Sequence, residues 1–352
     1  MMTLRLLETK PQMIPGSTAW RLADLGEAKG KQELFTRQSP QRLRVLREHA
    51  VIESAVSSTR MEGVEIDKQR IGTVVFGKPI LRDRNEEELR GYREALRLIH
   101  SNASQLPIDE KTILKVHLLA KGEIWDAGHY KEKNSDIIER YKDGSSRVRF
   151  KTVPAVEARD FTLELVQLWD RLLQDHCIHP LIVMAGFNLD FLCIHPFRDG
   201  NGRVSRLLLL LQCYHLGYDV GRYISLERII EQNKDRYYET LEQSSIGWHE
   251  CKHNPWPYLN YVLFILKTAY REFEERLGSI GAPRGAKTEV IEAAINSISG
   301  SFTLSRLEAA CPGASRDMIR KVLRNLQKTG RVKCLGRGPG AIWEKGNTLK
   351  RG

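Results

Sequence analysis

The chain has 352 residues, of which 41% are hydrophobic and 28% are charged, values typical of a globular protein with two or three domains. Its longest purely apolar run, Tyr261–Leu266, is far too short to span a bilayer, and its first residues hold no apolar segment of signal-peptide length, so we expect a cytoplasmic protein without a membrane partner. Six scattered cysteines, none in a Cys-x-x-Cys pair, argue against a zinc site and indicate reduced thiols.

The net charge of +11 is concentrated near the C-terminus. Residues 283–352 carry 14 Lys and Arg against 5 Asp and Glu, whereas the first 282 residues carry 41 against 39. The basic character therefore belongs almost wholly to the last 70 residues, which indicates a separate module with an acidic partner.

Helical periodicity dominates the first 280 residues, so the sequence predicts a mostly α protein. Helices are expected over 41–61, 86–100 and 109–120, the third started by Pro107 and Asp109. The segment 140–153 differs, because turn residues precede alternating Val148 and Phe150, which predicts a short β-hairpin or flap. Further helices are predicted over 156–175, 181–191, 201–216, 229–242 and 257–277.

A stretch of small residues with proline and glycine, 279–286, is the expected linker. It follows an N-terminal region, 1–105, and a core, 106–278, and it precedes a small domain at 287–352. In that domain we expect helices over 287–297, 305–310 and 316–329, and then strands over 332–335 and 341–343 around a glycine-rich tip. Three helices followed by such a hairpin predict a winged helix-turn-helix domain.

Residues 195–206, His-Pro-Phe-Arg-Asp-Gly-Asn-Gly-Arg-Val-Ser-Arg, carry the parts that phosphoryl-type transfer requires. Gly200-Asn201-Gly202 stands before a leucine-rich helix, whose N-terminal N–H groups and dipole favour an anion. Arg203 and Arg206 are three residues apart on the first turns of this helix, so we expect both to face the same ligand.

Two further residues of this segment supply the remaining groups that phosphoryl-type transfer requires, a metal ligand and a base. Asp199 is the carboxylate of the loop and can hold Mg²⁺ that bridges phosphates. His195 can act as a general base near neutral pH. Each residue alone has an ordinary structural explanation, as a structural histidine, a turn or a solvated face, but twelve contiguous residues that supply every role favour a functional site.

The segment matches the Fic family motif, HPFx(D/E)GNGRxxR, at every specified position, and the chain resembles this family from Arg42 to Leu277. The resemblance implies a helical core with one hairpin that transfers AMP from ATP to a Ser, Thr or Tyr hydroxyl. It implies that His195 deprotonates the hydroxyl, that Phe197 anchors the loop and that Asp199 coordinates Mg²⁺. The residues implied to bind the phosphates are Gly200, Asn201, Gly202, Arg203 and Arg206, with Arg206 nearest the γ-phosphate.

Two neighbouring segments resemble the family less closely. In Gly128-His-Tyr-Lys131, Lys131 replaces the arginine of the family's GxYR, and lysine cannot make the bidentate contacts of a guanidinium. The flap, about 134–153, is expected to hold the target protein as an added strand. Asn233, Tyr237 and Tyr238 resemble the residues on the adenine side, although tyrosines that pack a helix explain them equally well.

The expected helix at about 41–63 ends in Ser58-Thr-Arg-Met-Glu62-Gly63, which matches the family's inhibitory motif, (S/T)xxxE(G/N). Ser58 and Glu62 share a helix face, and Gly63 is a natural helix stop. The resemblance implies that Glu62 pairs with Arg206 and occupies the γ-phosphate position. The alternative is an ordinary solvated carboxylate at a helix end.

The expected helix 316–329 in the C-terminal domain is amphipathic. It has an apolar face of Ile319, Val322, Leu323 and Leu326, and its remaining positions include Arg316, Arg320, Lys321, Arg324 and Lys328. Such a helix can enter the major groove of DNA, with Lys333 and Arg337 on the wing touching phosphates. Winged helices also serve as protein-binding or dimerisation modules, so a protein partner stays open.

Three functions are compatible with these residues. The first is an AMP transferase restrained by Glu62, and the second is removal of AMP from a modified target, with Glu62 orienting a water. The third is a nucleotide-sensing regulator that binds DNA through 287–352, although a sensor has no need of a base such as His195. The motif also admits UMP or phosphocholine as the transferred group, and the family resemblance suggests a homodimer.

Overall fold

The computed structural model describes residues 2–9, 13–36, 40–63, 67, 74, 81, 83–122, 126–140, 143–279, 291–292, 294–295, 298, 301–311, 315–336 and 341–346. The chain divides into two compact units, Met1–Glu274 and Glu275–Gly352. Residues 1–105 therefore share one compact unit with nearly all of the expected core, 106–278. Apart from Ser279, the expected linker lies outside the described residues.

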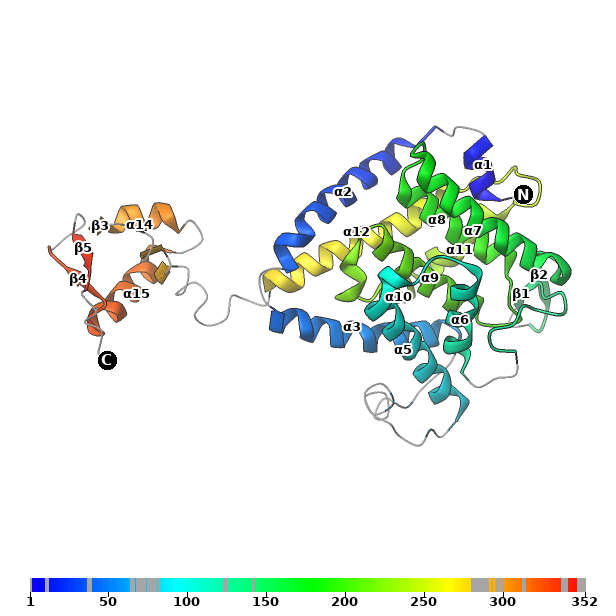
Figure 1. Ribbon diagram of the computed structural model, residues 1–352, viewed down its shortest axis with the longest axis horizontal. Coiled ribbons are helices and arrows are strands. Elements are labelled where there is room, and N and C mark those ends of the chain that lie inside the picture. Colours follow the sequence, from blue (N-terminus) through cyan, green and yellow to red (C-terminus); the bar gives the residue numbers. More distant parts are fainter. Residues whose placement is uncertain are drawn as a thin grey trace. The chain divides into compact units, whose positions relative to one another are not determined.

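Two helices form the centre of the first unit (Figure 1). In α8 (Pro180–Ile194) every residue after Pro180 is buried, and in α9 (Asn201–His215) every residue from Arg203 to Tyr214 is buried. A helix that is apolar on all sides must be covered on all sides. The helices α1 (Thr3–Thr9) and α7 (Ala158–Asp175) pack on α8, while α9 packs against α3 (Pro40–Met61), α5 (Arg84–Asn102) and α6 (Glu110–Lys121).

The remaining helices of this unit are α2 (Gly16–Thr36), α10 (Leu226–Gln232), α11 (Lys234–Ser245) and α12 (Trp256–Ser279), with 3₁₀ turns at Ala103–Gln105, Ala155–Glu157 and Asp219–Arg222. Polar caps set several of their starts. Asp109 accepts from the Thr112 N–H at 2.7 Å before α6, the start expected from the sequence, and Asp83 accepts from the Glu86 N–H at 2.9 Å before α5. No helix in the described part of the chain could cross a membrane.

The structure corrects several of the expected element boundaries. The single helix expected over 229–242 is two helices, α10 and α11, because the backbone leaves helical geometry at Asn233, with φ −116° and ψ 33°. Neither α1 nor α2 was expected. Helix α2 contains Gly16, Gly26 and Gly30 among many charged residues, which weakens any apolar periodicity.

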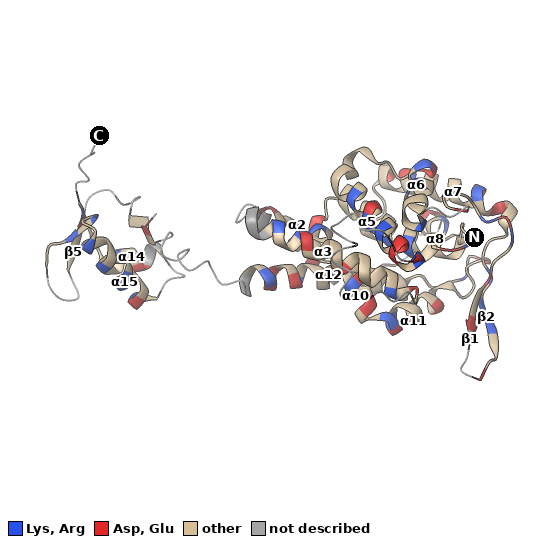
Figure 2. Ribbon diagram, turned by 90° about the horizontal axis from the view of Figure 1, so that it is seen from below, with Lys and Arg blue, Asp and Glu red and all other residues tan. Residues whose placement is uncertain are grey.

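The flap is an antiparallel hairpin of β1 (Ile137–Arg140) and β2 (Ser146–Phe150). It begins three residues earlier than the expected segment 140–153, and its register shifts between Ile137 and Ile138. The strands β1 and β2 extend away from the helical body (Figure 2). Ile137 and Ile138 are adjacent in β1, so its sequence does not alternate, and only β2 with Val148 and Phe150 showed the pattern of a strand.

The second unit contains β3 (Phe302–Thr303), α14 (Leu304–Ala310), α15 (Arg316–Lys328), β4 (Val332–Cys334) and β5 (Ile342–Lys345). Its antiparallel sheet has the order β3-β5-β4. Buried side chains from both helices, including Leu307, Ile319 and Leu323, form its core. This arrangement is compatible with a winged helix-turn-helix domain, although most of the expected helix 287–297 lies outside the described residues.

A buried carboxylate holds the N-terminal helix against the core. Asp190 of α8 accepts hydrogen bonds from the N–H groups of Thr3 at 2.6 Å and Leu4 at 2.9 Å, and from Trp248 Nε1 at 2.7 Å. Leu4 packs closely at Gly186, where a β-carbon would lie 2.9 Å from Leu4 Cδ2. Burial raises the pKa of Asp190 from 3.8 to about 6, against the opposing effect of its three donors.

We expect Asp190→Asn to lower the free energy of unfolding, because the new amide N–H₂ would face N–H donors. Since the pKa of Asp190 is higher in the folded than in the unfolded state, the folded parent binds the extra proton, and its stability falls as pH rises from about 4 to about 6. Urea unfolding across this range should show the advantage of the parent over Asp190→Asn shrinking by up to about 3 kcal/mol. An advantage that grows with pH would contradict this assignment.

Candidate active site

The loop between α8 and α9 is shaped by its own side chains. His195 ends α8 in a left-handed conformation, φ 53°, and its N–H donates to the Phe191 carbonyl at 3.0 Å. The Asn201 amide receives the Phe197 N–H at 2.9 Å and donates to the Phe197 carbonyl at 2.7 Å. The buried side chain of Asn201 therefore holds the loop closed, whereas the sequence had placed it among the phosphate-binding groups.

Phe197 anchors this loop to α6. Its buried ring stacks on His117 with centroids 3.8 Å apart and planes 3° apart. His117 Nδ1 accepts from the Gly128 N–H at 2.9 Å, so Nε2 carries the proton that faces the Asp199 carbonyl at 3.1 Å. Burial lowers the pKa of His117 to about 4, which keeps this bridge neutral. Sequence reasoning missed His117, because a lone histidine on an amphipathic helix gives no functional signal.

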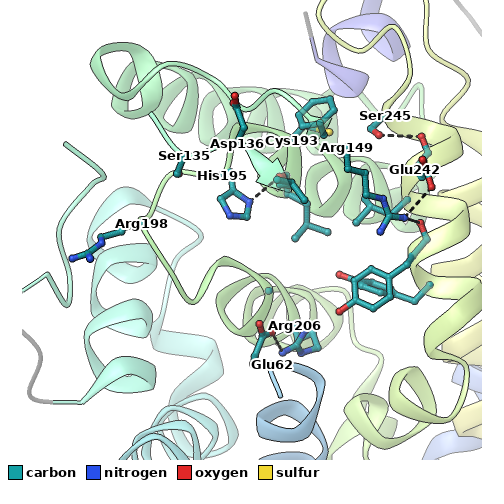
Figure 3. A pocket seen from close by; sticks show the side chains of 17 residues that line it. Glu62, Ser135, Asp136, Arg149, Cys193, His195, Arg198, Arg206, Glu242 and Ser245 are labelled. Atoms are coloured by element: carbon teal, nitrogen blue, oxygen red, sulfur yellow. Dashed lines mark hydrogen bonds and ion pairs between the residues drawn. The ribbon is translucent and has the colours of Figure 1, made fainter. Parts of the chain in front are cut away.

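A cavity of about 320 Å³ lies above the loop, and Figure 3 shows His195 on one side of it and Arg206 with Glu62 on the other. His195 Nδ1 lies 3.4 Å from the Leu192 carbonyl, which can only accept a hydrogen bond. The proton therefore belongs on Nδ1, and Nε2 keeps its lone pair. Burial and the charge of Lys131 lower the pKa of His195 to about 4, so the imidazole is neutral at physiological pH.

Arg206 is buried beneath this cavity and is held by the end of α3. Its Nη2 donates to Glu62 Oε1 at 2.7 Å and to the Ser58 carbonyl at 3.2 Å, and its Nε donates to Ser58 Oγ at 3.0 Å. Burial disfavours the charge of the guanidinium, but Glu62 raises the pKa of Arg206 above its usual value. Gly63, with φ 80°, ends the helix directly after Glu62.

The Glu62 carboxylate also lies against the N-terminus of α9. A β-carbon at Gly202 would lie 2.6 Å from Glu62 Oε1, so only glycine leaves room for the carboxylate there. Gly200, the N-cap of α9 with φ 82°, takes a backbone conformation that side chains disfavour. The first turn of α9 therefore already faces a negative group at the position where helix N-termini bind anions.

Arg203 does not face the cavity with Arg206, contrary to the expectation from their spacing. Its Nη1 lies 3.0 Å from Glu88 Oε2 of α5, and its side chain is 2% exposed. The buried Nζ of Lys121 lies 3.5 Å from Glu88 Oε1 and contacts Asp199 Oδ2. Two acids and two bases thus form one balanced network, in which burial opposes ionisation of Asp199 but Lys121 lowers the pKa of Asp199 below its usual value.

Glu88 and Lys121 were both missed from the sequence. Lys121 stands in the last turn of α6, where a basic residue is ordinary, and Glu88 stands on a helix rich in charged residues. Only packing brings them to Asp199 and Arg203. Asp199 itself is 53% exposed and, in the described part of the chain, no group of three or more His, Cys, Asp or Glu side chains is placed to hold a metal.

The three residues expected on the adenine side of the site lie in two different places. Tyr237 and Tyr238 line the cavity with ring centroids 5.1 Å apart, and the buried Tyr237 also packs against Tyr258 and Tyr261. Asn233 instead donates to the Ile229 carbonyl at 2.8 Å at the junction of α10 and α11. The same cluster of tyrosines thus lines the cavity and packs the helices together.

The flap is tied to the site at both of its ends. Arg149 of β2 donates to the Tyr238 carbonyl at 2.5 Å and lies 3.2 Å from Glu242 of α11 (Figure 3). Lys131 donates to Thr152 Oγ1 at 2.7 Å, and its N–H donates to the Pro196 carbonyl at 2.9 Å. Burial lowers the pKa of Lys131 to about 8. Its ammonium makes a single hydrogen bond to Thr152, as expected from a lysine at the position of the family's arginine.

Comparisons with known proteins agree with this geometry. The sequence profile of the Fic/DOC family matches residues 107–213. The chain is 27% identical over 181 residues to a protein adenylyltransferase Fic of Nematostella vectensis, a match that covers 49% of this chain and 37% of that protein. It is 31% identical over 119 residues to a Fido domain-containing protein of Dictyostelium discoideum, covering 32% of this chain and 80% of that protein.

Among solved structures, a Fic family protein from Desulfovibrio desulfuricans shares the fold with a TM-score of 0.62 at 22% identity, over 97% of this chain and 100% of that one. The profile match contains the whole loop from His195 to Arg206, and the Dictyostelium relative is matched over most of its length. The chain belongs to the Fic/DOC family.

Proposed function

We propose that this protein is a transferase that moves AMP from ATP to a hydroxyl group of a target protein, and that Glu62 restrains it. The observation that carries the proposal is the cavity in which a neutral His195 faces Arg206 and Gly202. A base and an anion-binding helix end opposite each other are the parts that phosphoryl-type transfer needs. The likeness to a protein named as an adenylyltransferase supports AMP as the group transferred.

In this reaction the hydroxyl oxygen forms a bond to the α-phosphorus of ATP. The bond from the α-phosphorus to the bridging oxygen breaks, and pyrophosphate leaves with the electron pair. The hydroxyl proton passes to Nε2 of His195, whose tautomer is set by the Leu192 carbonyl. The N-terminal amides of α9 and the guanidinium of Arg206 stabilise the phosphate charge.

Asp199 is the residue that would hold Mg²⁺. A single carboxylate that is 53% exposed fits the way proteins bind this ion, which keeps waters and takes most other ligands from substrate phosphates. Bound there, the ion supplies positive charge to the phosphates. Because Lys121 already contacts Asp199, the lysine and the ion compete for the same carboxylate.

The restraint follows from charge and space. Glu62 bonds Arg206 at 2.7 Å and lies against Gly202, so it fills the anion site at the start of α9. Its carboxylate would repel the outermost phosphate of ATP and leave Arg206 unavailable to it. Glu62 is 29% exposed at the end of its helix, so it can leave Arg206 without unpacking the core.

We place the target protein on the flap. In the described part of the chain β1 pairs only with β2, so its outer edge is open to an added strand. Ile137 of β1 lines the same cavity as His195. A hydroxyl on a strand bound along β1 is therefore brought to the side of the cavity that holds the base.

A second candidate, removal of AMP from a modified target, rests on the same carboxylate. Glu62 lines the cavity opposite His195, where it could orient a water for attack on the phosphorus. The two reactions require opposite effects of Glu62. Loss of the carboxylate should activate AMP transfer, but it should abolish AMP removal.

We expect Glu62→Gly to increase self-modification with labelled ATP by about tenfold or more, because Arg206 and the α9 N-terminus become free for the triphosphate. Mass spectrometry after incubation with each nucleoside triphosphate, or with a CDP-choline donor, identifies the group transferred. Glu62→Gly/His195→Ala should show no transfer.

Arg60→Gly is the matched control for this variant. It gives the end of α3 the same backbone freedom and, among the described residues, removes the contact of Arg60 with Glu231, at 3.6 Å, while the pair of Glu62 with Arg206 is kept. It should transfer at the low rate of the parent. Equal rates in Glu62→Gly and the parent would refute the restraint.

The pH dependence of transfer should report the buried base. In Glu62→Gly, kcat/KM should stay level as pH falls from 8 to about 5 and decline only near pH 4, because His195 loses its proton-accepting lone pair at its lowered pKa of about 4. Removing Glu62, which raises this pKa, cannot shift the decline upward. A decline centred near 6.5, the value of an exposed imidazole, would exclude a desolvated His195 as the base.

Lys121 should raise the Mg²⁺ concentration that nucleotide binding requires. In the Glu62→Gly background, Lys121→Met should lower the Mg²⁺ concentration that half-saturates binding of a fluorescent ATP analogue by about tenfold, since one competing charge on Asp199 is removed. Lys121→Arg keeps the charge and should retain the parent's Mg²⁺ dependence. Circular dichroism checks folding, and an unchanged Mg²⁺ requirement in a folded Lys121→Met would show that the pair is only structural.

A further inference from the structure

The helix α15 presents two opposed faces in the second unit. Ile319, Val322, Leu323 and Leu326 are buried in the core of this unit. At helical spacing, Lys321, Arg324 and Lys328 fall on the opposite side, and all three are exposed. In Figure 2, α15 carries basic residues along its length. We call the surface formed by Lys321, Arg324 and Lys328 the basic stripe.

The other cations of α15 are already paired with acids. Arg316 Nε lies 3.1 Å from Glu308 of α14, and Arg320 Nη1 lies 3.6 Å from Asp317. Within the described residues, no acid lies in ion-pair range of the basic stripe. Three adjacent cations that no local acid neutralises repel one another, and an external anion relieves that repulsion.

The surface beside the stripe is polar. Lys321, Arg324 and Lys328, with Asn325 and Gln327, surround a depression of about 290 Å³. In the described part of the chain no apolar or aromatic side chain lines it, whereas protein-binding hot spots are rich in Trp and Tyr as well as Arg. Amide side chains next to cations are the pattern of a surface that contacts phosphates and base edges.

We propose that the second unit binds duplex DNA, with α15 in the major groove and the basic stripe on the phosphates. A helix about 10–12 Å across fits a major groove about 12 Å wide. The stripe extends from Lys321 to Lys328, seven helical rises or about 10 Å of helix, and meets phosphates along one groove wall. The helix α15 packs its apolar face on the core that it shares with β3 and β4, so the side that carries the basic stripe is turned away from the sheet.

The proposal is independent of AMP transfer. The proposal uses residues of the second unit only, and the binding assay contains no ATP. The binding energy is expected to be mainly electrostatic, so its signature is the salt dependence of the association constant. Each phosphate contact contributes about −0.9 to the slope of log K against log of salt concentration.

The experiment measures fluorescence anisotropy of a labelled 24-base-pair duplex of mixed sequence with the full-length protein at several salt concentrations. The test variant is Lys321→Gln/Arg324→Gln/Lys328→Gln, which keeps good helix formers on the exposed face. Its affinity at 0.1 M salt should fall by at least about tenfold, and its salt slope should be smaller by about two to three.

The matched control is Lys111→Gln/Lys115→Gln/Lys252→Gln, which removes the same charge from exposed positions of the first unit. It should bind within about twofold of the parent if the stripe, rather than net charge, is responsible. Unlabelled duplex DNA should compete, and polyglutamate at equal charge should not. Absence of salt-dependent binding by the parent, equal loss in both triple variants, or competition by polyglutamate, which points to an acidic protein partner, would overturn the proposal.

Discussion

A guanidinium buried at the centre of a helical body must have hydrogen-bonding partners, and here the end of one helix supplies them to the start of another. Arg206 lies one turn into α9, and α3 delivers Ser58 and Glu62 to it from 144 or more residues earlier in the chain. An unpaired buried charge costs several kcal/mol, so this contact holds α3 against α9. The same carboxylate lies against Gly202 at the start of α9. The contact that satisfies the buried guanidinium is therefore also the one through which we propose that the protein is restrained.

The charges around the loop from His195 to Arg206 are balanced in two different ways. Glu88, Lys121 and Arg203 are nearly inaccessible to water, and they hold Asp199 in a network that neutralises itself. Glu62 is partly exposed and directly follows the last residue of α3. The buried network and the pair of Glu62 with Arg206 share no residue. The proposed release of Glu62 would therefore leave the network that holds the loop in place.

Much of the fold follows from local patterns. The start of α6 at Asp109, the burial of α8 on all sides and the glycines before α9 follow from capping, hydrophobicity and backbone freedom. The helices α1 and α2 were not predicted. The side chain that holds α1, Asp190, lies 187 residues from Thr3 in the sequence, and α2 lacks a clear apolar stripe. The break between two helices at Asn233 was not predicted, because the apolar pattern of α10 continues into α11.

The sequence by itself determined which chemical groups the loop from His195 to Arg206 contains, because twelve contiguous residues carry a histidine, a carboxylate, two glycines around Asn201 and two arginines. It also determined the spacing of Ser58 and Glu62 on one helix face. Only the tertiary structure decided which arginine faces the cavity, that Asn201 closes the loop, and that Lys121 shares Asp199. Those outcomes depend on which side chains of α3, α5 and α6 reach the loop, and packing between distant helices is not encoded in the loop's own residues.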